Sequence, residues 1–168
     1  EKNGYRAKTI QITAKEKLCP CDEMECNPVT CPYAKGHFDR VNDAVFDLLH
    51  RCEMIERDDI LSQADRYTVC PFELCLDTAS WCDNVICDYN YVFDPNVYLK
   101  RFFQEGIKGD YIFLIDEAHN MVERSRQMYS AQIYKEDFLT VKRIMKEHSR
   151  SIEKALEKCN KILLGMKR

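Results

Sequence analysis

Four of the ten cysteines fall within thirteen residues, from Cys19 to Cys31, in a segment that three prolines also interrupt up to Pro32. A segment so poor in apolar side chains cannot bury a core of its own, so something else must organise it. The first residues lack the charged-then-apolar pattern of a signal peptide, so we expect reduced thiols rather than a disulfide framework. Four thiolates can bind a tetrahedral zinc ion or an iron–sulfur cluster. The spacing differs from the paired Cys-x-x-Cys pattern of zinc ribbons. This difference disfavours zinc, but both a zinc ion and an iron–sulfur cluster stay open as interpretations.

The other cysteines divide into two kinds. Cys70 stands directly before a proline, apart from the first four. The remaining ones lie in apolar or helical surroundings, where a free cysteine usually behaves as a small buried hydrophobic side chain; they are Cys52, Cys75, Cys82, Cys87 and Cys159.

The overall composition is that of a folded protein. The 168 residues suffice for one domain with a sizeable core, and they are 45% hydrophobic and 32% charged. No run of eighteen apolar residues occurs, so we expect no membrane partner and a cytoplasmic location.

The net charge of −3 conceals an uneven distribution, because residues 142–168 contain nine Lys or Arg against three Glu. A second basic set comprises Lys2, Arg6, Lys8, Lys15 and Lys17. Either set could face phosphate, but a solvated surface is the simpler interpretation.

Hydrophobic periodicity predicts alternating strands and helices in the first two thirds of the chain. The predicted elements are a strand over 8–13, an amphipathic helix over 37–51, a short helix from Asp58 to 64, a helix over 72–80, a short strand over 84–87 and a helix opening at Asp94-Pro95. In the helix over 37–51 we expect Phe38, Val41, Val45, Leu48 and Leu49 to face the core. We expect Asp58 to cap its helix.

The run Tyr111–Ile115 is continuously apolar and rich in β-forming residues, which predicts a strand covered on both faces of a parallel sheet. Asp116-Glu117-Ala118-His119 follows it directly. In nucleotide hydrolases a carboxylate at the carboxyl end of such a strand holds Mg²⁺, and a neighbouring Glu polarises the attacking water. Asp116 and Glu117 fit these two roles. The alternative is an ordinary acidic helix start, but the apolar strand upstream favours the functional interpretation.

No phosphate-binding loop accompanies this acidic box. Such a loop is Gly-rich and ends in Gly-Lys-Ser/Thr, whereas the five glycines of this chain occur singly. We therefore predict that the chain alone does not hydrolyse ATP, and that it is part of a larger enzyme whose start precedes Glu1.

The residues beyond Ser130 form a strongly helical pattern. Apolar side chains recur at intervals of three or four: Phe138, Ile144, Met145, Ile152, Leu156, Cys159, Leu163 and Met166. We interpret this stripe as one arm of a helical hairpin whose partner helix lies outside the chain.

The order of motifs resembles a known family. KLCP, the cysteine-rich loop, CPFELCLDTASWCDNVICDYNYVFDP and YIFLIDEAHN are similar to the iron–sulfur superfamily-two DNA helicases, the XPD and DinG relatives, over roughly residues 8–125. The resemblance implies a predominantly helical α/β fold: partial RecA-like motor strands, an iron–sulfur cluster insertion and a helical arch segment. The implied divisions are 1–18 and 83–128 in motor domain 1, 19–82 in the cluster domain and 129–168 at the start of the arch.

The resemblance also implies site residues. The family's first 4Fe-4S ligand falls on Cys19 and its last on Cys70. We choose Cys26 and Cys31 as the middle pair, because Cys19 and Cys21, separated by one proline, would strain a compact cluster; Cys21 is the substitute. For DNA binding, Lys15 matches a basic position between cluster and DNA, and Phe72 matches a pore-lining aromatic. A surface lysine and a core aromatic are the structural alternatives. His119 matches the residue that couples the nucleotide site to DNA-gripping motifs.

The resemblance further implies an ATP-dependent DNA helicase moving 5′ to 3′, acting in DNA repair or replication on single-stranded or forked DNA. ATP and Mg²⁺, held by Asp116, would act in the full-length protein together with the remaining motor domains of the same polypeptide. Two alternatives from other classes stay open. One is a non-enzymatic nucleic-acid-binding module with structural zinc, and the other is a redox-responsive regulator with a labile cluster.

Overall fold

A computed structural model describes residues 4, 6–106 and 109–166. The chain divides into two compact units, Glu1–His119 and Asn120–Arg168. Three residues of the predicted basic sets, Lys2, Lys167 and Arg168, lie outside the described residues. Within the described part, no helix has the length and apolar content needed to cross a bilayer.

The first unit contains a three-stranded parallel sheet. Strand β1 (Thr9–Gln11) lies between β2 (Met54–Ile55) and β3 (Asn84–Ile86). Ile10 aligns with Ile55 on one side and with Val85 on the other. Parallel neighbours require crossover connections, and helices supply them here. The predicted α/β class, predominantly helical with a few parallel strands, is thus confirmed, although the strands are shorter than predicted.

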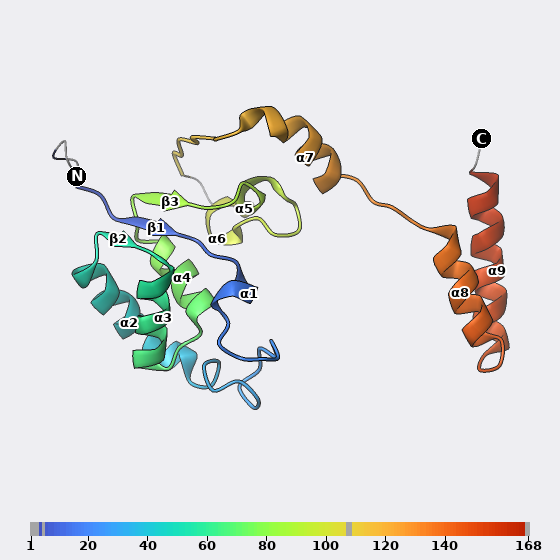
Figure 1. Ribbon diagram of the computed structural model, residues 1–168, viewed down its shortest axis with the longest axis horizontal. Helices are drawn as coiled ribbons and strands as arrows, with labels where there is room; N and C mark the ends of the chain where they lie inside the picture. Colours follow the sequence, from blue (N-terminus) through green and yellow to red (C-terminus); the bar gives the residue numbers. More distant parts are fainter. Residues whose placement is uncertain (1–3, 5, 107–108, 167–168) are drawn as a thin grey trace. The chain divides into compact units, whose positions relative to one another are not determined.

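Three helices cover the strands and form the core with them. They are α2 (His37–Arg51), α3 (Arg57–Tyr67) and α4 (Pro71–Ala79), which gather on one side of the strands in Figure 1. Helix α4 packs on β1 and against both other helices. Ile10, Leu48 and Leu74 are completely buried where these elements meet. Burial of apolar surface is therefore what holds this unit together.

Helix α2 has the predicted bounds, but its inward face differs at one position. Val41, Val45 and Leu48 are buried as predicted, whereas Phe38 is 86% exposed. His37, one residue earlier and about 100° around the helix, occupies the inward position and is buried. The prediction that Phe38 faces the core was wrong, because a polar residue takes that place.

Helix α3 begins one residue earlier and ends three residues later than predicted, and its cap is Glu56 rather than Asp58. The backbone N–H of Glu56 donates to Oδ2 of Asp59 at 3.0 Å, and the Glu56 side chain accepts from the backbone of Asp59 in return. This reciprocal capping box satisfies two N–H groups that the helix leaves without partners. An acidic cap was predicted correctly, but it was assigned two residues too late in the chain.

The helix predicted to open at Asp94-Pro95 forms only in part. The single turn α5 (Asn90–Phe93) ends before Asp94, and only the single turn α6 (Lys100–Phe103) lies within the predicted helix. Between them, the Asp94 carboxylate accepts the N–H of Asn96 at 2.8 Å. A side chain that bonds the backbone in this way offers the chain a turn in place of a helix.

The apolar run Tyr111–Ile115 is extended but belongs to no strand. Ile112 and Leu114 are 92% and 95% exposed. Tyr111 and Phe113, on the alternate face, contact the rings of Phe93, Phe102 and Phe103. The predicted strand covered on both faces is therefore not found, because a strand needs a hydrogen-bonded neighbour and none of the described residues provides one.

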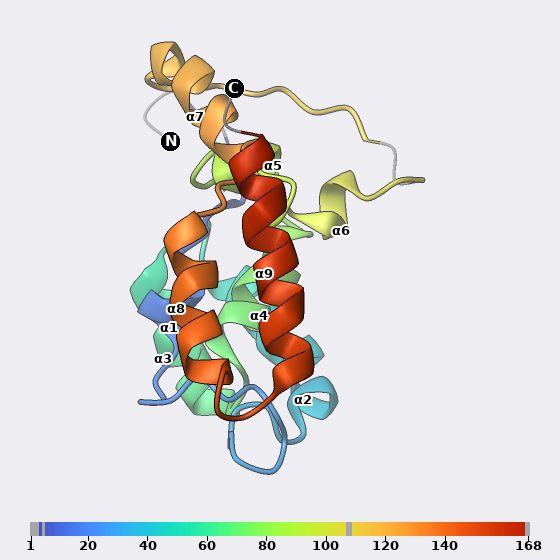
Figure 2. The same cartoon turned by 90° about the vertical axis from the view of Figure 1, so that its right-hand side faces the viewer.

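The second unit contains α7 (Met121–Met128), α8 (Lys135–Met145) and α9 (Arg150–Gly165), and the short 3₁₀ helix η1 (Ala118–Asn120) precedes α7. Helices α8 and α9 pack against each other as a hairpin, which Figure 2 shows. Ser149 caps α9, and Lys142 pairs with Glu157 at 3.6 Å across the hairpin. The prediction that the partner arm lies outside the chain was wrong, since the turn after residue 145 divides the predicted stripe into two arms.

Candidate cluster site and acidic box

Cys70 is held in place by α4. It is the N-cap residue of this helix, and Pro71 occupies the first turn, where a missing N–H costs no hydrogen bond. The Cys70 N–H donates to Nδ1 of His37 at 3.2 Å. Burial raises the pKa of the Cys70 thiol. The fold of the first unit therefore positions the backbone of Cys70.

The three other predicted ligands and the substitute Cys21 lie on the segment 19–31, which local turns organise. Helix α1 (Lys15–Leu18) leads into it, and Leu18 is buried. The Asn27 side-chain oxygen accepts the N–H groups of Val29 and Thr30 at 2.9 and 3.0 Å. Val29 is 92% exposed. Short-range hydrogen bonds rather than apolar burial thus shape this loop.

Cys21 and Cys31 approach each other within this loop. Their sulfur atoms are 4.0 Å apart. The pKa of the Cys21 thiol is raised to about 11 by desolvation and by its neighbours Cys31 and Cys19. The structure therefore brings together two of the thiols that the sequence singled out, Cys31 and the substitute ligand Cys21.

Cys26 lies near Lys15. A hydrogen bond to Cys26, together with the nearby Cys70 and Glu73, raises the pKa of the Lys15 ammonium against the lowering effect of burial. The Lys15 nitrogen also lies 6.0 Å from the centre of the Phe72 ring, within the range of a cation–π contact. Both residues predicted to bind DNA thus sit beside two of the predicted cluster ligands.

The thiols are suited to a soft metal but are not preassembled around one. Among the described residues, no three His, Cys, Asp or Glu side chains lie close enough together to hold a metal ion. Thiolates are the preferred ligands of both zinc and iron–sulfur clusters. A metal-bound form would require the loop to close toward Cys70. The choice of Cys26 over Cys21 as a ligand stays a prediction.

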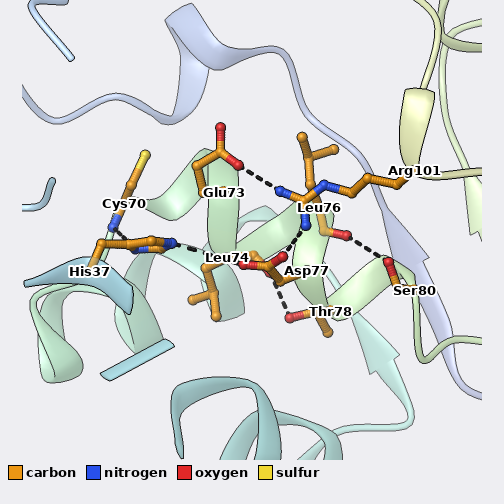
Figure 3. A network of polar contacts seen from close by, with 9 residues as sticks. All are labelled: His37, Cys70, Glu73, Leu74, Leu76, Asp77, Thr78, Ser80 and Arg101. Carbon is orange, nitrogen blue, oxygen red and sulfur yellow. Dashed lines mark hydrogen bonds and ion pairs between the residues drawn. The ribbon is translucent and has the colours of Figure 1, made fainter. Parts of the chain in front are cut away.

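A polar network centred on the buried side chain of His37, drawn in Figure 3, contacts the backbone of Cys70. His37 is 4% exposed, and its Nε2 lies 3.9 Å from Oδ2 of Asp77. Burial lowers the pKa of His37, although the Asp77 and Glu73 carboxylates oppose this effect. Arg101 pairs with Asp77 and, at 2.7 Å, with Glu73.

His37 and Arg101 were not predicted from the sequence. The available signal for His37 was a polar residue at an inward position of an amphipathic helix, which apolar periodicity ignores. Arg101 gave no local signal, because its partners on α4 lie 24 and 28 residues earlier in the chain.

The acidic box lies on an exposed turn. The backbone of Glu117 has a left-handed φ of 51°, and its N–H donates to Oδ1 of Asp116 at 2.9 Å. The Glu117 carboxylate lies 3.2 Å from Nε2 of His119, so the structure brings these two predicted residues together. The carboxylates are open to solvent and could accept a hydrated cation.

A parallel α/β unit, an acidic Asp-Glu-Ala-His box and a thiol-rich loop together define a segment of the superfamily-two helicase class. The chain belongs to the DEAD_2 family, whose model matches residues 5–138. The resemblance to XPD and DinG relatives expected from the sequence is thereby confirmed.

Three curated relatives are similar to this chain. The general transcription and DNA repair factor IIH helicase subunit XPD/RAD3 of Saccharomyces cerevisiae is 31% identical over 64% of this chain and 13% of its own length. The Fanconi anemia group J protein homolog of Gallus gallus is 29% identical over 45% of this chain and 6% of its own length. The ATP-dependent DNA helicase CHL1 of Candida glabrata is 24% identical over 76% of this chain and 17% of its own length. This chain thus spans a small part of each relative.

Proposed function

We propose that this chain is a segment of an ATP-dependent DNA helicase that acts in DNA repair or replication. Membership of the DEAD_2 family carries the proposal, supported by the names of two relatives that are helicases. The remaining motor domains would lie in the same polypeptide and provide the phosphate-binding loop that these 168 residues lack. Movement from 5′ to 3′ and a cytoplasmic location are part of the proposal.

In the acidic box, Asp116 would hold Mg²⁺ on bound ATP, and Glu117 would orient and deprotonate the attacking water. The 3.2 Å contact between His119 and Glu117 supports a role for His119 in orienting that carboxylate. In the intact polypeptide, Glu117→Gln should reduce DNA-stimulated ATP hydrolysis by roughly 100-fold or more. Glu123→Gln, in the following helix α7, is the matched control and should leave the rate unchanged. An active Glu117→Gln protein would remove Glu117 from this role.

For the thiol loop, we propose a 4Fe-4S cluster held by Cys19, Cys26, Cys31 and Cys70. A bound cluster would link the loop to α4 and replace the core that the loop lacks. The intact polypeptide, purified anaerobically, should be brown, absorb at roughly 400 nm and contain about four iron atoms per chain. A colourless, iron-free anaerobic preparation would contradict the cluster.

A structural zinc ion is the second candidate, and the Cys21–Cys31 approach favours it. In a tetrahedral site with zinc–sulfur bonds of about 2.3 Å, two sulfurs are separated by about 3.8 Å. The observed separation is 4.0 Å. Elemental analysis separates the candidates, because a zinc site predicts about one zinc and no iron per chain.

Lys15 and Phe72 would contact single-stranded or forked DNA beside the cluster. Aromatic stacking and phosphate contacts are tolerant of sequence, which suits a translocating enzyme. Lys15→Ala should weaken binding of single-stranded DNA. The slope of log affinity against log salt concentration should fall by the amount that corresponds to about one phosphate contact. Lys135→Ala on α8, in the other unit and outside both basic sets, serves as the control. An unchanged salt dependence in Lys15→Ala would argue for the purely structural role of this lysine.

A further inference from the structure

Cys70 stands at one end of a polar network that joins three elements far apart in the sequence. His37 opens α2, Asp77 lies on α4 and Arg101 lies on α6. Figure 3 shows His37 between the Cys70 backbone and Asp77, with Arg101 reaching Asp77 and Glu73. These contacts connect the segment predicted as the cluster domain with the segment predicted as motor domain 1.

The hydrogen bonds define the chemical state of His37. Its Nδ1 accepts the Cys70 N–H, so this nitrogen carries no proton. In the neutral ring, the proton is then on Nε2, which is buried and has no hydrogen-bond partner within the described structure. The Asp77 carboxylate, 3.9 Å away, is suitably placed to attract this N–H.

Arg101 determines where the Asp77 carboxylate lies. Its guanidinium contacts Asp77 with one nitrogen and Glu73 with another, which are two points on the same face of α4. A planar guanidinium with two carboxylate partners restricts the orientation of both. The Asp77 carboxylate is thereby held toward His37, and His37 toward the N–H of Cys70.

We infer that His37 is a positioning residue for Cys70, and that Asp77 and Arg101 hold it in the orientation in which it accepts the Cys70 N–H. The inference rests on the proposed role of Cys70 as a cluster ligand. This hydrogen bond fixes the backbone of Cys70, from which the sulfur projects. Cys70 is also the proposed ligand that opens α4. Loss of this support should loosen the sulfur and speed release of the cluster, as for other groups that orient metal ligands.

Two substitutions at position 37 separate the two ring nitrogens. His37→Asn places an oxygen near the Nδ1 position and can still accept the Cys70 N–H, whereas His37→Gln places its amide near Nε2 and cannot. Both remove the ring and leave a polar side chain. The measurement is the rate at which the intact, anaerobically purified polypeptide loses its visible absorption in excess iron chelator. Iron content and thermal unfolding are recorded in parallel.

We expect His37→Asn to lose the cluster at nearly the wild-type rate and His37→Gln to lose it roughly tenfold faster, with similar unfolding temperatures for the two variants. Arg66→Gln, which removes an ion pair to Asp47 away from Cys70, is the control and should match wild type. Equal rates of cluster loss in the Asn and Gln variants would overturn the inference. If neither variant gives folded protein, Asp77→Asn replaces them, with faster loss expected and an unchanged rate overturning the inference.

The iron content of the wild-type protein separates a failure of this inference from a failure of the proposed cluster. A wild-type protein without iron overturns the cluster itself, and the positioning role with it. A wild-type protein with iron and indistinguishable Asn and Gln variants overturns only the role of His37.

Discussion

Helix α4 and the loop before α2 each contribute proposed cluster ligands, yet they are held by opposite means. Around α4, Leu74, Cys75 and Ala79 are completely buried, and Cys70 opens the helix on this rigid base. In the loop, Met24 and Val29 are 53% and 92% exposed. The backbone of one proposed ligand is therefore positioned by folding, whereas the other proposed ligands would depend on a metal for their final arrangement.

This difference assigns separate tasks to the two regions. If the proposed cluster binds, Cys70 would provide a fixed point for its first contact with the protein. The loop of adaptable thiols would then close over the cluster and bring Lys15 and Phe72 into a defined relation with it. Folding of the first unit and ordering of the loop should consequently be separable by experiment.

The largest expected effect is the loss of the fixed ligand. Cys70→Ser should abolish iron binding in the intact polypeptide without weakening α4, because serine is itself a favourable N-cap residue. Cys82→Ser is the matched control; its sulfur donates to the Thr78 carbonyl at 3.4 Å, and it should bind iron normally. Iron analysis and thermal unfolding together test the pair. Full iron content in Cys70→Ser would contradict the assignment of Cys70.

The adaptable region is tested by its two competing thiols. Cys26→Ser should lower the iron content strongly, whereas Cys21→Ser should leave it close to wild type. The proximity of Cys21 to Cys31 makes the reverse outcome informative. Iron loss only in Cys21→Ser would move the middle ligand pair to Cys21 and Cys31. Iron and acid-labile sulfide, measured on the same anaerobic preparations, provide the test.

The two regions should also differ in what they contribute to stability. Leu74→Ala removes a fully buried side chain and should lower the free energy of unfolding by about 2 to 5 kcal/mol. Val29→Ala, on the exposed loop, should change it by less than about 0.5 kcal/mol. Urea unfolding of the metal-free protein measures both values. A comparable loss in Val29→Ala would mean that the loop packs more tightly than its exposure indicates.

The sequence predicted what depends on local pattern and missed what depends on distant partners. The bounds of α2 follow from its periodicity, and the helix after Cys70 follows from a proline suited to a first turn. The run Tyr111–Ile115 has strand-forming residues, but a strand also requires a neighbour. The thiols were recognised by type and spacing. His37 was not, because its importance comes from a contact 33 residues away.

The smallest expected effect is a pH dependence in the α2–α3 interface. The pKa of Asp47 lies below its ordinary value of 3.8, mainly because Gln63 donates a hydrogen bond to it, with help from Arg51 and Arg66. A carboxyl whose pKa is lower in the folded state stabilises the fold above its unfolded pKa, and this contribution is lost as the pH falls through the folded value. Asp47→Asn should therefore reduce the difference in urea midpoint between neutral pH and acid pH below 3.8. Asp22→Asn, on the loop, is the control and should leave that difference unchanged; an equal reduction in both variants would place the acid sensitivity outside the α2–α3 interface.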